Sequence, residues 1–204
     1  MRSLFAILIG FLPLVAISAS GSLYFYEVRE NSWIALSGTT NVNSFTCVSE
    51  GEIPRGSIVA DVLPGSNAIY FSEAELELAV SSFDCHNRMM NKDLHESMGG
   101  KNHPSIHIEL VEIRPHESVE RGSEGKVRAS LAITMNGKTK HTDLTVDFHQ
   151  GNPFNMLISG SKELLMSDFG IDPPSPALGL VRVRDKVTIA FRLAVETSLI
   201  TQTQ

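Results

Sequence analysis

Residues 127–148 read Val-Arg-Ala-Ser-Leu-Ala-Ile-Thr-Met-Asn-Gly-Lys-Thr-Lys-His-Thr-Asp-Leu-Thr-Val-Asp-Phe, and this stretch decides the fold class. Apolar residues occupy every second position before Asn136-Gly137 and again after Thr142. Alternation with a period of two is typical of a β-strand that buries one face. Asn-Gly between two such runs favours a type I′ turn, because both residues readily adopt positive φ. The stretch therefore predicts a β-hairpin.

The same alternation continues on both sides of this hairpin. In residues 183–195 the odd-numbered positions are mostly apolar and the even-numbered ones mostly polar, which predicts another half-buried strand. Shorter alternating runs predict strands at residues 32–43, 76–80 and 106–110. Many short strands with one apolar face predict either a β-sandwich or a β-barrel, and periodicity alone leaves both open.

One short segment breaks the β pattern. Residues 91–98 predict a single helix, with Asn91 as its N-cap and Gly99 just after its end.

Composition restricts the class of protein. The chain has 204 residues, of which 42% are hydrophobic, and this is enough to bury the core of one all-β domain. Its formal net charge is −6, and an acidic protein repels the phosphate backbone of nucleic acids. We therefore expect no nucleic-acid partner.

The first 20 residues differ from the rest and predict a cleaved signal peptide. Arg2 is followed by an apolar run from Leu4 to Ile17 and then by the small residues of Ser18-Ala-Ser-Gly21. The alternative is a transmembrane anchor, but the run is shorter than the roughly 20 residues that a bilayer span requires. We expect a signal peptide at 1–20, one mature domain at 21–204 that does not span the membrane, and a periplasmic or secreted bacterial protein.

The chain has two cysteines, Cys47 and Cys85. Two cysteines allow only one intramolecular pairing, and exported proteins live where disulfides persist. A Cys47–Cys85 disulfide is therefore the expectation, and two buried free thiols are the alternative.

Four segments together carry a resemblance to a known family. Residues 90–98 (Met-Asn-Lys-Asp-Leu-His-Glu-Ser-Met), followed by His-Pro-Ser-Ile-His-Ile at 103–108, are similar to a short "RDxHL"-like helix, a proline and a strand. Residues 131–139 resemble an "LTIxGxT" hairpin, and Ser-Asp-Phe-Gly-Ile at 167–171 resembles a "DFGI" element that precedes the closing strand. A weaker match lies at 37–45. In this order and spacing they resemble the YceI-like family.

The resemblance spans roughly residues 30–196 and implies a fold and a function. It implies an all-β protein built as an extended antiparallel eight-stranded lipocalin-like β-barrel with one short helix. It also implies an apolar channel for a lipid: an isoprenoid quinone, a polyprenol or a fatty-acyl lipid. The expected function is lipid or polyisoprenoid binding as a carrier or storage protein, with no cofactor beyond a bound long-chain lipid.

Alternation and resemblance together nominate the residues that line this barrel. From alternation alone they fit a filled core as well as a channel, and the resemblance favours the channel. The nominated apolar lining consists of Leu78, Val80, Ile106, Ile108, Leu131, Ile133, Leu144, Val146, Phe148, Phe169, Val187, Ile189, Phe191 and Leu193.

Other functional classes find little support in the sequence. His103 and His107 are four apart, but on a strand that spacing spans about 13 Å, too far for two ligands of one ion. Metal-binding spacings and a Gly-x-Ser-x-Gly nucleophile elbow are missing, so we expect neither metal nor catalytic residues. The remaining alternative is a non-enzymatic envelope or stress-related module that binds a protein partner. A homodimer formed through an outer face is compatible with lipid binding and with protein binding.

Overall fold

The computed structural model describes residues 22–49, 55–62, 65–100, 102–115, 124–152, 155–175 and 177–199. The expected signal peptide at 1–20 lies outside the described residues, as does His116. The strands are β1 (Ser22–Val28), β2 (Trp33–Thr40), β3 (Ser44–Ser49), β4 (Gly56–Val62), β5 (Ile69–Ser72), β6 (Glu75–Ala79), β7 (Phe83–Asp84), β8 (Ser105–Pro115), β9 (Glu124–Met135), β10 (Lys138–Asn152), β11 (Asn155–Leu165) and β12 (Val183–Leu199). The helices are α1 (Arg88–Ser97) and three 3₁₀ turns, η1 (Val80–Ser82), η2 (Met166–Phe169) and η3 (Ala177–Gly179).

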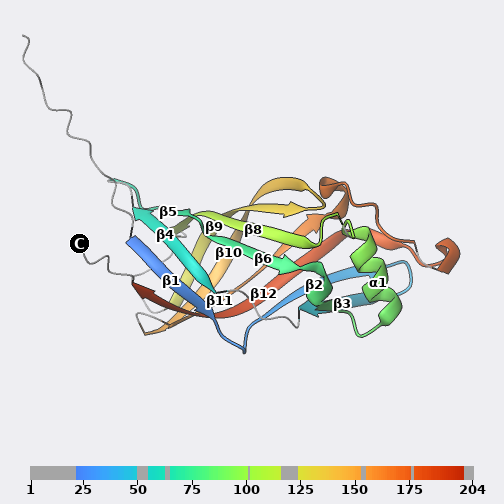
Figure 1. The fold of residues 1–204 in the computed structure, drawn as a ribbon, viewed down its shortest axis with the longest axis horizontal. Coiled ribbons are helices and arrows are strands. Elements are labelled where there is room, and N and C mark those ends of the chain that lie inside the picture. Colours follow the sequence, from blue (N-terminus) through green and yellow to red (C-terminus); the bar gives the residue numbers. More distant parts are fainter. Residues whose placement is uncertain are drawn as a thin grey trace, which may run out of the picture.

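The sheet closes on itself. Strands β1, β4, β5, β8, β9, β10, β11 and β12 pair in this order, every pair is antiparallel, and β12 pairs back to β1 with Val195 opposite Val28. This ring of eight strands confirms the predicted all-β barrel (Figure 1). Closure leaves no sheet edge along the ring, which is how small β proteins avoid edge-to-edge aggregation.

Three positions of the ring are filled by broken strands. β1 and β2 lie end to end along the same side of β12, since Val28 faces Val195 and Trp33 faces Arg192. In the same way, β4 pairs with β1 and β3 pairs with β2, so β4 and β3 share one position of the ring. β5 and β6 share another, because both pair with β8. The barrel is therefore two stacked halves that share the long strands β8 to β12.

The predicted hairpin is confirmed. β9 and β10 pair from Met135 opposite Lys138 to Glu124 opposite His149. Between them Asn136 has φ 48° and Gly137 has φ 71°, the two positive φ angles of a type I′ turn. The Asn136 side-chain amide also donates hydrogen bonds of 3.3 Å to the carbonyl oxygens of Phe169 and Gly170, which fastens η2 to the hairpin tip.

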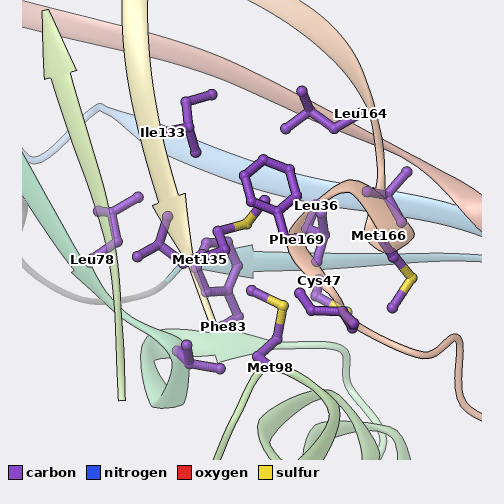
Figure 2. Close-up of a cluster of buried hydrophobic side chains, with 14 of the residues drawn as sticks. Leu36, Cys47, Leu78, Phe83, Met98, Ile133, Met135, Leu164, Met166 and Phe169 are labelled. Carbon is purple, nitrogen blue, oxygen red and sulfur yellow. The ribbon is translucent and has the colours of Figure 1, made fainter. Parts of the chain in front are cut away.

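The interior of the half that carries α1 is a packed core. Its largest fully buried side chains are Phe169, Ile171 and Cys47. Figure 2 shows Phe169 beside Leu36 and Met135 within this cluster. Phe169 comes from η2 and not from a strand, so the Asp-Phe-Gly element fills the end of the barrel from within.

The interior of the other half is less tightly filled. The inward-facing side chains of β1, β4 and β5, such as Tyr24, Ile58 and Phe71, are only half-buried. A second, smaller cluster around Leu144 and Val146 packs against side chains that include Leu131 and Phe191. Leu131 and Phe191 also pack against the larger cluster, so they lie where the two halves meet.

Helix α1 starts earlier than predicted. Its N-cap is Asn87, whose side-chain oxygen accepts hydrogen bonds from the backbone N–H groups of Met89 and Met90. Asn91 lies inside the helix and was wrongly predicted as the cap. The end was predicted correctly, because Met98 is the C-cap and Gly99 follows it with φ 100°. Within the described residues no helix is long and apolar enough to cross a membrane.

Candidate functional site

A cavity of about 270 Å³ lies beneath α1 at one end of the barrel. Its walls come from α1, from β2, β3, β8, β9 and β12, from the η1–β7 segment, and from the chain between η2 and β12. The lining residues are Leu36, Thr40, Val42, Asn43, Phe45, Cys47, Val80, Phe83, Asn87, Met89, Met90, Asp93, Leu94, Ser97, Met98, Ile106, Met135, Met166, Ile171, Pro174, Val181, Val183, Val187 and Ile189. Most are aliphatic, aromatic or methionine side chains, so the cavity suits an apolar guest.

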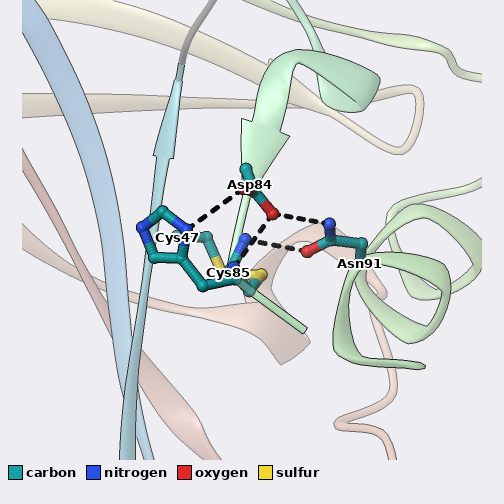
Figure 3. Close-up of polar contacts among 5 residues, drawn as sticks. Cys47, Asp84, Cys85 and Asn91 are labelled. Atoms are coloured by element: carbon teal, nitrogen blue, oxygen red, sulfur yellow. Dashed lines mark hydrogen bonds and ion pairs between the residues drawn. A yellow bond between two sulfur atoms is a disulfide. The ribbon is translucent and has the colours of Figure 1, made fainter. Parts of the chain in front are cut away.

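Helix α1 is held over this cavity by a polar network and a disulfide. Cys47 in β3 and Cys85 just after β7 form the disulfide, as predicted (Figure 3). Asn91 accepts a hydrogen bond of 2.8 Å from the backbone N–H of Cys85 and donates one of 2.7 Å to Asp84. The first turns of α1 are thereby tied to the β3–β7 wall.

The charge of Asp84 is stabilised by the same network. The hydrogen bond from Asn91 lowers the pKa of the Asp84 carboxyl, and a second bond from the backbone N–H of His86 lowers it further. The ring of His86 lies 3.2 Å from this carboxylate. Both Asp84 and His86 reach solvent, so the network positions α1 and lies outside the lining of the cavity.

Another wall of the cavity comes from the described residues between Gly170 and Val183, which include Ile171, Pro174 and Val181. The backbone N–H of Val183 donates to the carbonyl of Pro174, and Asn41 in the β2–β3 turn bonds both Leu180 and Arg182. These contacts hold the segment against the β2–β3 turn. Val42 and Met89, each 67% exposed, border the cavity on its solvent side.

The structure brings four of the nominated lining residues to this cavity: Val80, Ile106, Val187 and Ile189. Leu78, Ile133 and Phe169 are buried in the adjoining core, and Ile108, Leu131, Phe191 and Leu193 pack half-buried against it. Leu144 and Val146 form the smaller cluster of the other half, and Phe148 faces inward opposite Gly125. All fourteen belong to the barrel interior, and their contact with a ligand stays a prediction.

The helical wall of the cavity was not predicted from the sequence. Met90, Leu94 and Met98 recur at every fourth position of the chain and face the barrel core. This stripe is the signal that could have found them, because a spacing of four puts side chains on one helix face. Phe45, which also lines the cavity, sits near the start of the short strand β3, where alternation is too short to assign a face.

Two of the described histidines lie on different parts of the outer surface. His107 lies 2.7 Å from Glu75 on the outside of β8, and His149 lies 3.4 Å from Glu124 near the far end of β10. Among the residues that the structure describes, no group of three or more histidine, cysteine, aspartate or glutamate side chains is placed to hold a metal ion.

Comparison with models of known protein families gives a match. A model of the YceI-like domain family matches residues 30–195. No curated protein sequence matches the chain.

Two solved structures share the fold. BcnA from Burkholderia cenocepacia is 19% identical, covers 83% of this chain and 99% of its own, and superposes with a TM-score of 0.62. A polyisoprenoid-binding domain from Saccharophagus degradans, implicated in plant cell wall breakdown, is 9% identical, covers 86% of this chain and 98% of its own, and has a TM-score of 0.61. At these identities the likeness concerns the fold.

Proposed function

The chain belongs to the YceI-like domain family, and on that premise we propose that it binds one long apolar molecule inside its barrel, as an extracytoplasmic carrier or storage protein. The observation that carries this proposal is the apolar cavity of about 270 Å³ beneath α1. A module that only binds a protein partner does not require an internal apolar cavity.

The energetics favour a lipid chain. Burial of each CH₂-sized group in an apolar site stabilises the complex by about 0.8 kcal/mol. A dozen such groups would exceed the several kcal/mol that immobilising the ligand costs. Dispersion and hydrophobic contacts need no hydrogen bond to the tail, so the tail is selected mainly by its width and length.

The size of the cavity indicates how far the ligand extends. Pockets for small molecules commonly measure about 300–1,000 Å³, so the α1 cavity holds one end of a long chain. To reach the half-buried side chains of β1, β4 and β5, the rest of the chain would displace packed side chains such as Leu131 and Phe191. An isoprenoid tail is our first choice, because the Saccharophagus degradans domain of the same fold is described as polyisoprenoid-binding.

Two features support an extracytoplasmic location. The first 20 residues have the layout of a signal peptide, and the Cys47–Cys85 disulfide suits an oxidising compartment. We further propose that the protein is not an enzyme, because the sequence lacks a nucleophile motif and the described lining of the cavity holds a single charged side chain. Expression of the full chain in a bacterial host should yield a periplasmic or released protein whose mass begins near residue 21.

The experiment that tests lipid binding is native mass spectrometry of the protein purified from its compartment without detergent. We expect a one-to-one adduct on the order of several hundred daltons that is released on denaturation and proves apolar. Ile189→Phe should weaken this adduct, because Ile189 lines the cavity.

The matched control is Thr188→Phe, which places the same ring on the outward face of β12 and should leave the adduct intact. A clean apo mass, unchanged after incubation with quinones and polyprenols, would overturn the proposal in favour of the protein-binding module. The same spectra report whether the protein is a monomer or a homodimer.

A further inference from the structure

We infer that the cavity beneath α1 receives a head group that donates a hydrogen bond, either a hydroxyl or an ammonium group, and that it rejects phosphate and carboxylate heads. This inference rests on the proposed lipid-binding function. The side chain that carries it is Asp93.

The cavity has one charged lining residue. Among the described side chains that form its wall, only Asp93 is charged, and no lysine or arginine is among them. A site built for a phosphate or carboxylate needs basic side chains or a cluster of backbone N–H donors. This lining presents the opposite charge.

Asp93 lies on the cavity side of α1. It sits in the second turn of the helix, between Met90 and Leu94, which both pack on the barrel core. Its side chain is half-buried, and within the described residues it has no hydrogen bond or ion pair. The neighbouring Lys92 is turned to Glu96, with 3.8 Å between its Nζ and the carboxylate.

The stability of α1 does not explain why an aspartate occupies position 93. An acidic residue stabilises a helix within its first turn, but α1 has none there, and Asn87 supplies the N-cap. A carboxylate beside an apolar cavity loses hydration and gains nothing from the fold in return. A ligand that donates a hydrogen bond would supply the missing partner.

The side-chain oxygens of the two lining asparagines are already engaged as acceptors, and so are the hydroxyl groups of Ser97 and Thr40 as donors. The Asn87 side-chain oxygen accepts the N–H groups of Met89 and Met90, and the Ser97 hydroxyl donates to the carbonyl of Leu94. Thr40 and Asn43 bond each other across the β2–β3 turn. Asp93 is therefore the described lining carboxylate that lacks a hydrogen-bond partner, and an ionised carboxylate can only accept.

The chemistry of the head group follows from this carboxylate. A hydroxyl or an ammonium can donate to Asp93, and the ammonium gains charge attraction as well. A phosphate or carboxylate head would place a second negative charge in a poorly hydrated space, where repulsion is stronger than in water. The expected order of affinity is amine, then alcohol, then phosphate.

The test uses three probes with the same tail: geranylgeranylamine, geranylgeraniol and geranylgeranyl phosphate. Their dissociation constants for the mature protein are measured by displacement of a fluorescent apolar dye. We expect the amine to bind at least about tenfold more tightly than the phosphate. In Asp93→Asn, of nearly the same shape, the amine should lose about tenfold in affinity and the phosphate should bind more tightly than to the wild type.

Glu96→Gln is the matched control, because it removes a carboxylate from the exposed side of the same helix and should leave the three affinities unchanged. Asp93→Ser repeats the test with a smaller neutral residue should the asparagine variant melt at a lower temperature. Phosphate binding as tight as amine binding in the wild type, or unchanged affinities in both Asp93 variants, would overturn the head-group inference while leaving lipid binding intact. Failure of all three probes to bind the wild type would contradict the proposed function itself.

Discussion

Single polar side chains fix the segments that surround the cavity. The Asp185 carboxylate at the start of β12 accepts a hydrogen bond of 2.6 Å from the Ser167 hydroxyl and one of 2.8 Å from the Ser167 backbone N–H. These bonds lower the pKa of Asp185, the hydroxyl contributing most. One carboxylate thus holds η2, and with it the buried Phe169, against the closing strand.

Replacing Ser167 with alanine should raise the pKa of Asp185 toward its ordinary value of 3.8, because the largest of the hydrogen-bond contributions is removed. Since the folded pKa lies below the unfolded one, the stability that Asp185 contributes is fully present above the unfolded pKa and lost as the pH falls through the folded pKa. In Ser167→Ala the folded pKa moves toward the unfolded one, so the total contribution should be smaller and its loss should be complete at a higher pH. Carboxyl NMR titration of Asp185 measures the pKa, and Ser161→Ala on the exposed face of β11 is the control. An unchanged Asp185 titration in Ser167→Ala would contradict the hydrogen-bond origin of the shift.

At the residue scale, the sequence predicted those features that depend only on residues adjacent in the chain. Asn136-Gly137 forms the expected turn because its backbone preference is local. The helix start could not be read in the same way, since Asn87 and Asn91 are equally good caps in isolation. Asn91 is drawn into the helix because its amide satisfies Cys85 and Asp84, and those contacts exist only once β7 has folded.

At the scale of strands, glycine and aromatic residues form cross-strand pairs between neighbouring strands of the barrel wall. The register pairs Gly38 with Phe45, Gly56 with Tyr26 and Gly160 with Phe191, all on the inward face. A Cβ built at Gly160 would lie 2.9 Å from the Phe191 ring, so the ring lies flat over the glycine. Each such pair keeps a large ring along the wall instead of across the interior.

Gly160→Ala should destabilise the protein by about 1–3 kcal/mol, because the added methyl group collides with Phe191 and with Leu144, whose Cδ1 would be 3.0 Å away. Urea unfolding measures the effect. Gly151→Ala is the matched control, since a Cβ at this strand position meets nothing within 4 Å. Phe191→Leu should relieve part of the cost, and a fully additive double variant would argue against the proposed collision.

Strands were easier to predict than the site they enclose. β9, β10 and β12 show clean alternation, whereas in β11 Gly160 and Lys162 interrupt the inward face and conceal the strand. The cavity gathers short pieces of many elements, and each piece contributes too few residues to reveal its orientation. Asp93 in particular fits a helix terminus in the sequence, and its place beside the cavity depends on how α1 docks.

The disulfide joins elements that the ring of hydrogen bonds leaves weakly connected. β7 has only two residues paired with β3, Phe83 opposite Ser49 and Asp84 opposite Val48. Cys47 and Cys85 continue this register, and the covalent bond fixes the wall on which α1 stands.

Replacing both cysteines with alanine should lower the free energy of unfolding by about 3–4 kcal/mol, given the sequence separation of 38 between them. Denaturant unfolding with and without reductant measures this. The double alanine variant should be insensitive to reductant, which separates loss of the bond from other effects. A wild type equally stable in both conditions would show that the bond adds nothing.

On the scale of the whole molecule, the barrel depends on the pairing of its first and last described strands. β1 fills the gap between β4 and β12, with Tyr24 opposite both Ile58 and Leu199. Deleting residues 22–28 would expose two unpaired strand edges that carry half-buried apolar side chains.

Such edges template association with other chains, so we expect the deleted form to elute as oligomers or to aggregate. Size-exclusion chromatography with light scattering measures this. Truncation after residue 199, which leaves every described pairing in place, is the control. A monomeric deletion variant with unchanged stability would mean that β1 is dispensable for closure.

The closing pair also has a kinetic consequence. The β9–β10 hairpin joins neighbours in the chain and can form within microseconds, whereas Tyr24 and Leu199 lie at opposite ends of the described sequence. Folds dominated by such distant pairings fold in milliseconds to seconds. We therefore expect an assembly that spreads outward from the hairpin and meets at β1 and β12 last, so that the interior becomes sealed only in the final step. A lipid present while the chain folds would have access to the apolar interior before that seam closes.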